Sequence, residues 1–140
     1  MPPHQRALLN ILYTASWHEC WFLRLLRPFG LTPPQYNILR ILNGSLPKSL
    51  SVLDIKSRML DRSSNVSRLV EKLRQAGFVE RVPSAVDRRM VEVTISETGK
   101  RLLADIGLEM EKQENLPGQS LSEAEAAHLA DLLDKFREGR

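Results

Sequence analysis

The stretch that decides the fold spans residues 51–95 and reads SVLDIKSRMLDRSSNVSRLVEKLRQAGFVERVPSAVDRRMVEVTI. A short helix is expected first, capped by Ser51, and a break at 61–62 separates it from a second helix over about Ser63 to Gly77. The second helix is expected because apolar residues recur there at i, i+3, i+4 and i+7. This apolar stripe consists of Val66, Leu69, Val70 and Leu73.

The pattern changes to a period of two after Gly77, where a left-handed C-cap is expected. Two strands are therefore predicted, over Phe78 to Val82 and Met90 to Ile95, and together they form a hairpin. The side chains expected on one face of the second strand are Val91, Val93 and Ile95. Two helices followed by such a hairpin predict a winged helix-turn-helix, a mainly α fold with a small β-hairpin wing.

Polar side chains surround the apolar stripe at the start of the second helix. They are short hydroxyl and amide groups followed by basic groups, which suit contacts to base edges and phosphates in a major groove. The candidate DNA contacts here are Ser63, Ser64, Asn65, Ser67, Arg68 and Lys72. Double-stranded DNA is therefore the first partner that the sequence predicts.

The tip of the predicted wing carries Asp87, Arg88 and Arg89. If the backbone is extended there, positions 87 and 89 share a face, and Asp87 can fix the guanidinium of Arg89. A braced arginine at a projecting tip suits a narrow minor groove, where the negative potential is enhanced. All three residues are candidate DNA contacts.

The helices before this stretch are also predicted from local patterns. A long first helix is expected from about His4 to Arg27. Thr32 is the expected N-cap of the next helix, with Pro33 at its first position and Gln35 completing a capping box. This helix is expected to stop at 43–44. The expected buried side of the short helix at Ser51 is Val52, Ile55, Met59 and Leu60.

Two more helices should follow the hairpin, one starting at Ser96 and one capped by Ser122 and Glu125. The first and last helices carry more apolar side chains than one small lobe can cover, which predicts a homodimer joined by its N- and C-terminal helices. These side chains are Leu8, Ile11, Leu12, Ala15, Phe22, Leu25, Leu129, Leu132, Leu133 and Phe136. We expect one domain over 1–140, with dimerisation helices at 1–30 and 100–140 and a DNA-binding lobe at 32–96.

The amino-acid composition and the net charge limit the classes of protein to which the chain can belong. The chain has 140 residues, 42% hydrophobic and 26% charged, as in ordinary globular domains. Its net charge of +3 divides into +3 over 1–55, +5 over 56–101 and −5 over 102–140. The basic middle segment favours a phosphate-bearing partner. No stretch predicts a membrane span or a signal peptide, and a single cysteine fits a reducing compartment, so a cytoplasmic location is expected.

The residues predict no catalytic constellation, metal site or cofactor. There is no phosphate-binding glycine-rich loop and no Cys-x-x-Cys, and the three histidines are far apart in sequence. An enzyme is therefore not expected. The main interpretation is a DNA-binding transcriptional regulator, a repressor that a small ligand releases from DNA, and two alternatives to it stay open. One is a thiol-based redox-sensing regulator that uses Cys20, with Arg24 one turn away; the other is a winged-helix protein–protein assembly module that uses the acidic C-terminal helix.

A small aromatic or phenolic effector is the remaining expectation. Trp17, Trp21 and Tyr36 offer stacking faces and Arg24 offers a cation, a combination that suits an aromatic acid. The expected site lies between the first two helices and the winged lobe.

The chain resembles the MarR family of bacterial transcriptional regulators. The segments that carry the resemblance are 31–36, 65–73, 77–81, 87–89 and 94–100, which together cover about half of the chain. The resemblance implies a homodimer, two winged lobes on a palindromic operator, and a ligand cleft between the dimer helices and the DNA-binding lobe. It implies major-groove contacts from Ser63, Ser64, Asn65, Ser67 and Arg68, and a wing contact from Arg88 or Arg89.

Overall fold

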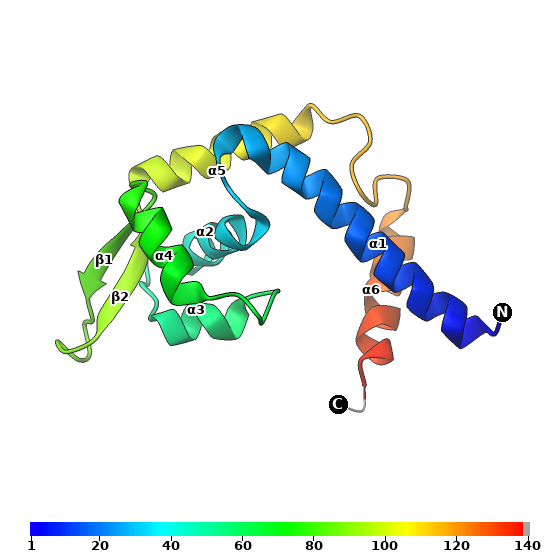
Figure 1. Cartoon of the computed structure of the whole chain (residues 1–140), viewed down its shortest axis with the longest axis horizontal. Helices are drawn as coiled ribbons and strands as arrows, with labels where there is room; N and C mark the ends of the chain where they lie inside the picture. Colours follow the sequence, from blue (N-terminus) through cyan, green and yellow to red (C-terminus); the bar gives the residue numbers. More distant parts are fainter. Residues whose placement is uncertain (139–140) are drawn as a thin grey trace.

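A computed structural model describes residues 1–138 and confirms the predicted fold class. Two antiparallel strands form the only sheet of this described part, and the remaining elements are helical (Figure 1). In chain order the elements are α1 (Pro3–Leu26), the 3-10 turn η1 (Arg27–Phe29), α2 (Pro33–Ser45), α3 (Val52–Arg58), α4 (Val66–Gln75), β1 (Val79–Pro83), β2 (Val91–Ile95), α5 (Glu97–Glu111) and α6 (Glu123–Phe136).

The core lies in the winged lobe, which we define as residues 32–96. Apolar side chains from α2, α3, α4 and the hairpin meet there, and α5 adds Leu103 and Ile106. Burial of this apolar surface is the main stabilising contribution to such a lobe. No residue of α6 is buried, so this helix contributes nothing to the core.

Local sequence signals account for α1 and α2. Pro3 occupies the first turn of α1, where its missing N–H costs nothing, and Gly30 adopts a φ of 70° after η1. The capping box of α2 is confirmed, because the Thr32 N–H donates to Gln35 Oε1 (2.9 Å) and the Gln35 N–H donates to Thr32 Oγ1 (3.4 Å). Helix α2 continues to Ser45, past its expected end. None of the helices in residues 1–138 has the length and apolarity to cross a membrane.

Helix α4 starts three residues later than the sequence pattern predicts. Asp61 is the reason, because its Oδ1 accepts hydrogen bonds from the Ser63 N–H (3.0 Å) and the Ser63 hydroxyl (2.6 Å). These bonds hold 61–64 in a turn. Asn65 is then the N-cap, and its Oδ1 accepts the Arg68 N–H at 3.2 Å.

Leu60 was expected on the buried side of α3, and this prediction is wrong. Helix α3 ends at Arg58 and the backbone of Met59 is extended, so Leu60 leaves the helical face and its side chain is 89% exposed. The Leu60 N–H instead donates to Asn37 Oδ1 on α2 at 3.0 Å. Ile55 and Met59 are buried as predicted.

The hairpin pairs Val79 with Ile95 and Pro83 with Val91. Val93 and Ile95 are buried, as the alternating pattern predicts. Val91 belongs to the same face of the strand but is 54% exposed, because its end of the hairpin extends beyond the core. Leu50 adds a short bridge to Val93, with an N–H to carbonyl distance of 3.0 Å, and so joins the loop before α3 to the wing.

Helix α5 packs closely on the base of the hairpin. The Ser96 hydroxyl caps it by accepting the Gly99 N–H (3.0 Å) and donates to the Gly77 carbonyl (2.6 Å). A Cβ at Gly99 would lie 2.2 Å from the Phe78 carbonyl oxygen. Only glycine therefore permits this approach of helix and strand.

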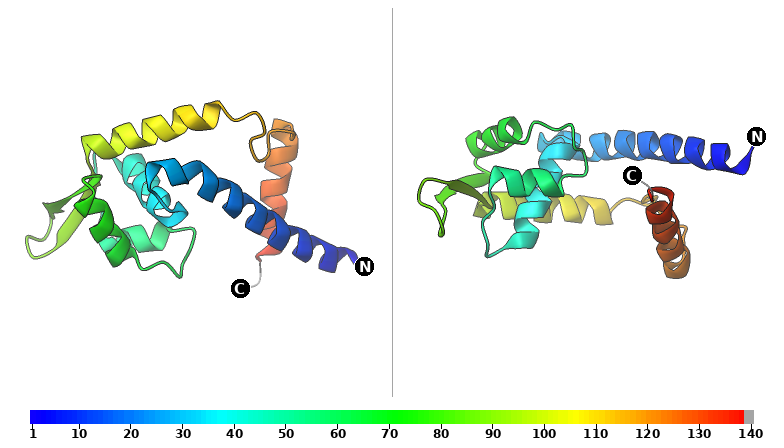
Figure 2. Two further views of the ribbon diagram at one scale, coloured as in Figure 1. Left: turned by 45° about the horizontal axis from the view of Figure 1, so that its top comes forward. Right: turned by 90° about the horizontal axis from the view of Figure 1, so that it is seen from below.

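Helix α6 stands apart from the winged lobe in both views of Figure 2. Its predicted capping box is confirmed by bonds between Ser122 and Glu125. Three of its apolar side chains are nearly half exposed, at 46% for Leu129 and 49% for both Leu132 and Phe136. The N-terminal half of α1 is similarly exposed. These faces lie at the opposite end of the molecule from the hairpin (Figure 2).

Candidate functional site

The helix expected to contact DNA presents a polar face. Val66, Val70 and Leu73 are buried, and α4 therefore turns its other side to the surface. Ser67, Arg68 and Lys72 are all exposed there. One hydroxyl and two cations on an exposed helix face can reach phosphates and base edges.

The candidate contacts before α4 are less available than the sequence suggests. The Ser63 hydroxyl donates to Asp61, and the Ser64 hydroxyl oxygen is buried with no hydrogen-bond partner among the described residues. Asn65 uses its Oδ1 as the N-cap acceptor, which leaves its amide nitrogen to donate. The hydrogen bonds from the Ser63 hydroxyl and N–H hold the pKa of Asp61 below its ordinary value.

Asp87 stabilises the wing tip, but through the backbone of Arg89 and not through its guanidinium as predicted. Asp87 Oδ1 accepts the backbone N–H of Arg89 at 3.0 Å, and residues 1–138 contain no ion pair between Asp87 and the Arg89 guanidinium. The extended geometry assumed for this pairing is absent, because the Met90 N–H donates to the Asp87 carbonyl (3.0 Å) and closes a turn. Arg88 and Arg89 are exposed on this turn.

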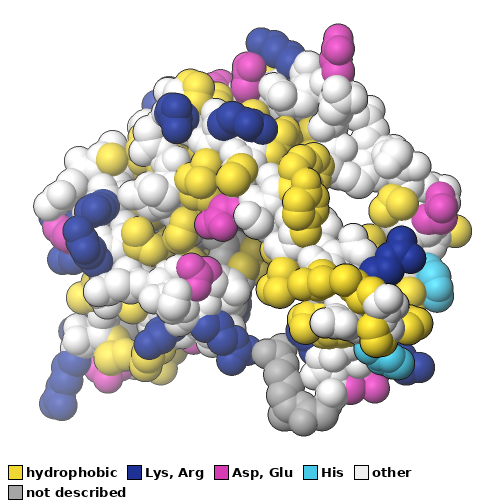
Figure 3. Space-filling model, turned by 45° about the vertical axis from the view of Figure 1, so that its right-hand side comes forward, with side chains coloured by type: hydrophobic (Ala, Val, Ile, Leu, Met, Phe, Trp, Pro, Cys, Tyr) yellow, Lys and Arg dark blue, Asp and Glu magenta, His cyan; other side chains and the backbone are white. Residues whose placement is uncertain are grey.

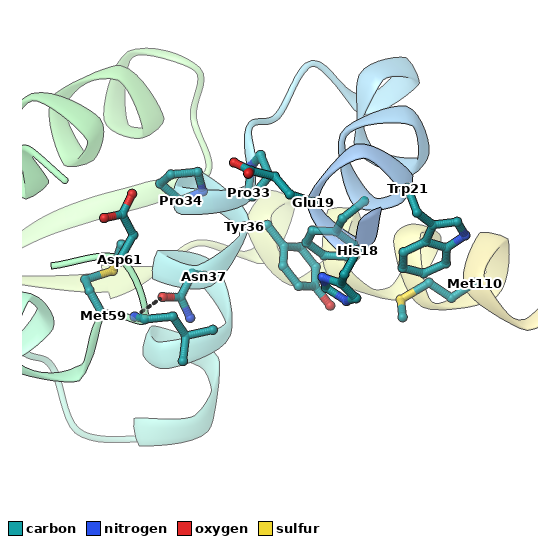
Figure 4. Close-up of a pocket in the computed structure, with 12 residues that line it drawn as sticks. His18, Glu19, Trp21, Pro33, Pro34, Tyr36, Asn37, Met59, Asp61 and Met110 are labelled. Atoms are coloured by element: carbon teal, nitrogen blue, oxygen red, sulfur yellow. Dashed lines mark hydrogen bonds between the residues drawn. The ribbon is translucent and has the colours of Figure 1, made fainter. Parts of the chain in front are cut away.

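A cavity of about 380 Å³ lies where α1, α2 and the loop after α3 meet (Figure 4). Its lining combines aromatic, proline and polar side chains. The residues that line it are His18, Glu19, Trp21, Phe22, Pro33, Pro34, Tyr36, Asn37, Met59, Leu60, Asp61 and Met110. Its size and aromatic lining suit a small organic ligand.

Aromatic rings form one end of this cavity. The ring centroids of Trp21 and Phe22 are 5.8 Å apart at an interplanar angle of 24°, and His18 stacks on Phe22 at the same distance. Tyr36 approaches Phe22 edge-on, at 5.0 Å and 76°. Figure 4 shows His18, Tyr36 and Trp21 on one side of the cavity and Asp61 on the other.

The structure separates the residues predicted to bind an effector. Tyr36 and Trp21 line the cavity, whereas Trp17 lines a different hollow, between α1 and α6. Arg24 lies beside Glu109 and Gln113 in a third depression. The cation expected for an aromatic acid is therefore not in this cavity. Cys20 is exposed on α1 and lines none of these three hollows.

Sequence reasoning missed much of the lining. His18 and Phe22 lie one helical turn apart, next to Trp21, so their spacing could have indicated a shared aromatic face. Asn37, Asp61 and Met110 come from three separate segments. No local pattern points to them, since only packing brings these segments together.

The lobe and the exposed basic side chains of α4 and the wing define a winged helix DNA-binding protein. Comparison with known proteins gives the family: the model of the MarR family matches residues 29–90. The chain is 36% identical over 113 residues to YfiV, an uncharacterised HTH-type transcriptional regulator of Bacillus subtilis, and this match covers 71% of the chain and 69% of YfiV. The chain belongs to the MarR family and is a DNA-binding transcriptional regulator.

Two further proteins are similar over different lengths. The HTH-type transcriptional repressor IacR of Pseudomonas putida is 32% identical over 76 residues, which cover 54% of this chain and 44% of IacR. The solved structure of BpsR from Bordetella bronchiseptica, described with the regulation of its DNA binding by 6-hydroxynicotinic acid, superposes with a TM-score of 0.77. That match covers 94% of this chain and 92% of BpsR at 21% identity, and it shows the same fold.

Proposed function

We propose that this chain is a repressor that binds a palindromic DNA operator as a homodimer and is released from it by a small aromatic effector. The observation that carries the proposal is the exposed basic face of α4 together with the arginines of the wing tip. Ser67, Arg68 and Lys72 are assigned to the major groove, and Arg88 and Arg89 to the flanking minor groove. We further propose that the protein acts in the cytoplasm, where the DNA lies, and we assign no catalytic step to it.

Four of the predicted contacts have narrower roles in this proposal. Ser63 and Ser64 belong to the turn before α4, and the buried Ser64 oxygen reaches no groove in this conformation. Asn65 contributes its amide nitrogen, and Asp87 supports the backbone of the tip. Arg68 is then the main residue proposed to recognise a base directly, since a guanidinium can donate two hydrogen bonds to a guanine.

The exposed apolar faces of α1 and α6 support a homodimer. Between the two helices lies an open hollow of about 520 Å³ whose apolar lining includes Ile11, Trp17 and Leu133. Figure 3, which turns this side forward, shows hydrophobic side chains gathered on it. Exposed apolar surface of this extent is a common mark of a protein interface. A two-fold dimer would place its two α4 helices in successive major grooves, about 10 base pairs apart.

The cavity beside α1 and α2 supports the effector part of the proposal. It lies between the long N-terminal helix and the winged lobe, so a ligand there would contact both parts. Release requires that the ligand bind the DNA-free arrangement more tightly than the DNA-bound one. IacR is named a repressor and BpsR is regulated by an aromatic acid, which supports the same two features here.

A salt titration with duplex DNA tests the DNA-binding part of this proposal. A pool of random duplexes would first be enriched for sequences that the full chain retains. Affinity for the enriched duplex should then fall steeply with salt, with a slope of about −0.9 for each phosphate contact. Size analysis of the complex should give two chains for each duplex. Salt-independent affinity, or a complex with a single chain, would contradict the proposal.

A further inference from the structure

The charge of the cavity differs from what an aromatic acid requires. Its described lining contains two carboxylates, Glu19 and Asp61, one imidazole and one amide, and none of the twelve lining residues is lysine or arginine. A bound carboxylate would lie among like charges without a counter-ion, and such an arrangement is unfavourable in a partly enclosed site.

The aromatic end of the cavity can hold the ring of a ligand and is also compatible with a nearby positive charge. Trp21, Phe22 and Tyr36 present ring faces or edges there, and the face of an aromatic ring attracts a cation through its quadrupole. A ligand with an apolar ring and an ammonium group can therefore match both ends of the cavity. Its ring would pack among the side chains of α1 and α2, with the ammonium near a carboxylate.

Asp61 has one oxygen engaged and one available. Oδ1 accepts both hydrogen bonds from Ser63, whereas no bond to Oδ2 with full hydrogen-bond geometry is present among the described residues; the nearby Ser64 hydroxyl also helps to lower the pKa of this carboxylate. The carboxylate thus has a spare acceptor and also holds the turn 61–64. Four residues after Asp61, the N-cap Asn65 starts α4. A displacement of this carboxylate would therefore also displace the start of α4, the helix that we assign to the major groove.

Asn37 makes a second connection between the cavity and the same loop. It lines the cavity from α2, and its Oδ1 accepts the Leu60 N–H at 3.0 Å (Figure 4). Two side chains that line the cavity therefore hold the segment between α3 and α4. Asn37 bonds Leu60 and Asp61 bonds Ser63, and a ligand in the cavity would contact both side chains.

Building on the proposed effector site, we propose that the cavity takes an aromatic cation rather than an aromatic acid, and that Asp61 couples this ligand to α4. The ammonium group binds Asp61 and draws its carboxylate toward the cavity. This movement weakens the two bonds to Ser63 and displaces the turn before α4. The recognition helix then no longer matches its groove, and DNA affinity falls.

Three probes of one shape test the charge preference. Phenylbutylamine is a cation at neutral pH, phenylbutanol is neutral and phenylbutyrate is an anion, and each carries the same ring on the same chain. Calorimetric titration of the full chain without DNA should rank the amine first, at least about tenfold tighter than the alcohol, and the acid last. An acid that binds as tightly as the amine, or failure of all three to bind, overturns the inference.

The two proposals can fail separately. Tight binding of the acid would overturn the cation preference and leave an aromatic effector in place. Failure of all three probes would remove both the cation and this cavity as an effector site, while DNA binding would still be judged by its own salt titration.

Substitution of Asp61 tests the coupling. Asp61→Asn keeps the shape and an acceptor oxygen for Ser63 but removes the charge, so amine affinity should fall about tenfold, to the level of the alcohol. Glu114→Gln removes an exposed carboxylate outside the cavity and should leave amine affinity unchanged. Saturating amine should lower the DNA affinity of the wild type at least tenfold and that of Asp61→Asn much less. An equal loss in both would overturn the coupling.

Ser63→Ala keeps the test decisive if Asp61→Asn does not fold. This variant retains the Asp61 charge and loses only the 2.6 Å hydroxyl bond. It should bind the amine at least as tightly as the wild type, because the carboxylate has one competitor fewer. The ratio of DNA affinities without and with amine should nevertheless shrink, since one connection to the turn is missing. An unchanged ratio would contradict the role of this turn.

Discussion

Glu71 on α4 and Arg81 on β1 form an ion pair that joins the proposed recognition helix to the first strand of the wing. Arg74 donates two further hydrogen bonds to the same carboxylate, at 3.0 and 2.6 Å. One acidic side chain therefore helps to hold the placement of α4 relative to the wing, in addition to the packing of their buried side chains. The two DNA-binding elements of the proposed dimer depend on this placement.

The first prediction concerns the pH dependence of this contact. Hydrogen bonds from Arg74, followed by the charges of Arg74 and Arg81, lower the pKa of Glu71 from its ordinary value of 4.5. A lowered pKa in the folded state means that the carboxylate stabilises the fold above the unfolded-state pKa, and that this contribution is lost as pH falls through the folded-state pKa. Wild type should therefore melt above Glu71→Gln at pH 7, and the difference should vanish in acid.

Melting curves of both chains between neutral and acidic pH measure this difference. Glu114→Gln is the control, since that exposed carboxylate has no ion pair within residues 1–138. A difference between wild type and Glu71→Gln that persists below the folded-state pKa would show that the contact acts through shape and not through charge.

The second prediction compares two glycines of α5. A Cβ at Gly99 would lie 2.2 Å from a backbone oxygen and 2.7 Å from Ile95, so Gly99→Ala should destabilise the lobe by about 1–3 kcal/mol. A Cβ at Gly107 meets nothing within 4 Å, and Gly107→Ala should instead stabilise the helix by about 0.5–1 kcal/mol. Urea unfolding of the two variants measures both signs. Equal effects would mean that α5 does not pack on the hairpin as described.

A third prediction separates the two DNA-binding elements. Arg68→Ala should cost about 1–3 kcal/mol on the preferred duplex and should relax specificity at one base pair, if this side chain reads a base edge. Arg89→Ala should weaken binding to many sequences, most where the flanks are rich in A·T pairs. Lys135→Ala, on α6, is a charge-matched control and should change neither property. Full affinity in both Arg88→Ala and Arg89→Ala would remove the wing from the interface.

The fourth prediction concerns assembly. Leu132→Asp places a charge on the exposed apolar face of α6 and should dissociate the dimer, while the lobe keeps its own core and unfolds cooperatively. Ala127→Asp adds the same charge to the opposite face of α6 and should remain dimeric. Sedimentation combined with melting curves distinguishes these states. A Leu132→Asp protein that remains dimeric would show that α6 lies outside the interface.

The sequence by itself determined the fold class and the local details of the helices. The capping boxes at Thr32 and Ser122, the apolar stripe of α4 and the buried residues of β2 near Ile95 follow from patterns that span no more than eight consecutive positions. The exposed basic residues of α4 could also be predicted, because a helix that buries one face must expose the other. These features depend on hydrogen bonds and periodicities within single elements.

Only the tertiary structure decided the details of the candidate site. Asp61 delays the start of α4 through a side-chain bond that competes with the helical pattern, and the wing tip closes a turn where an extended pair was expected. Arg24 and Tyr36 were grouped by chemistry, yet packing places them in different hollows. The cavity takes its charge from residues far apart in the chain, because side chains from separate elements meet only when the core has formed.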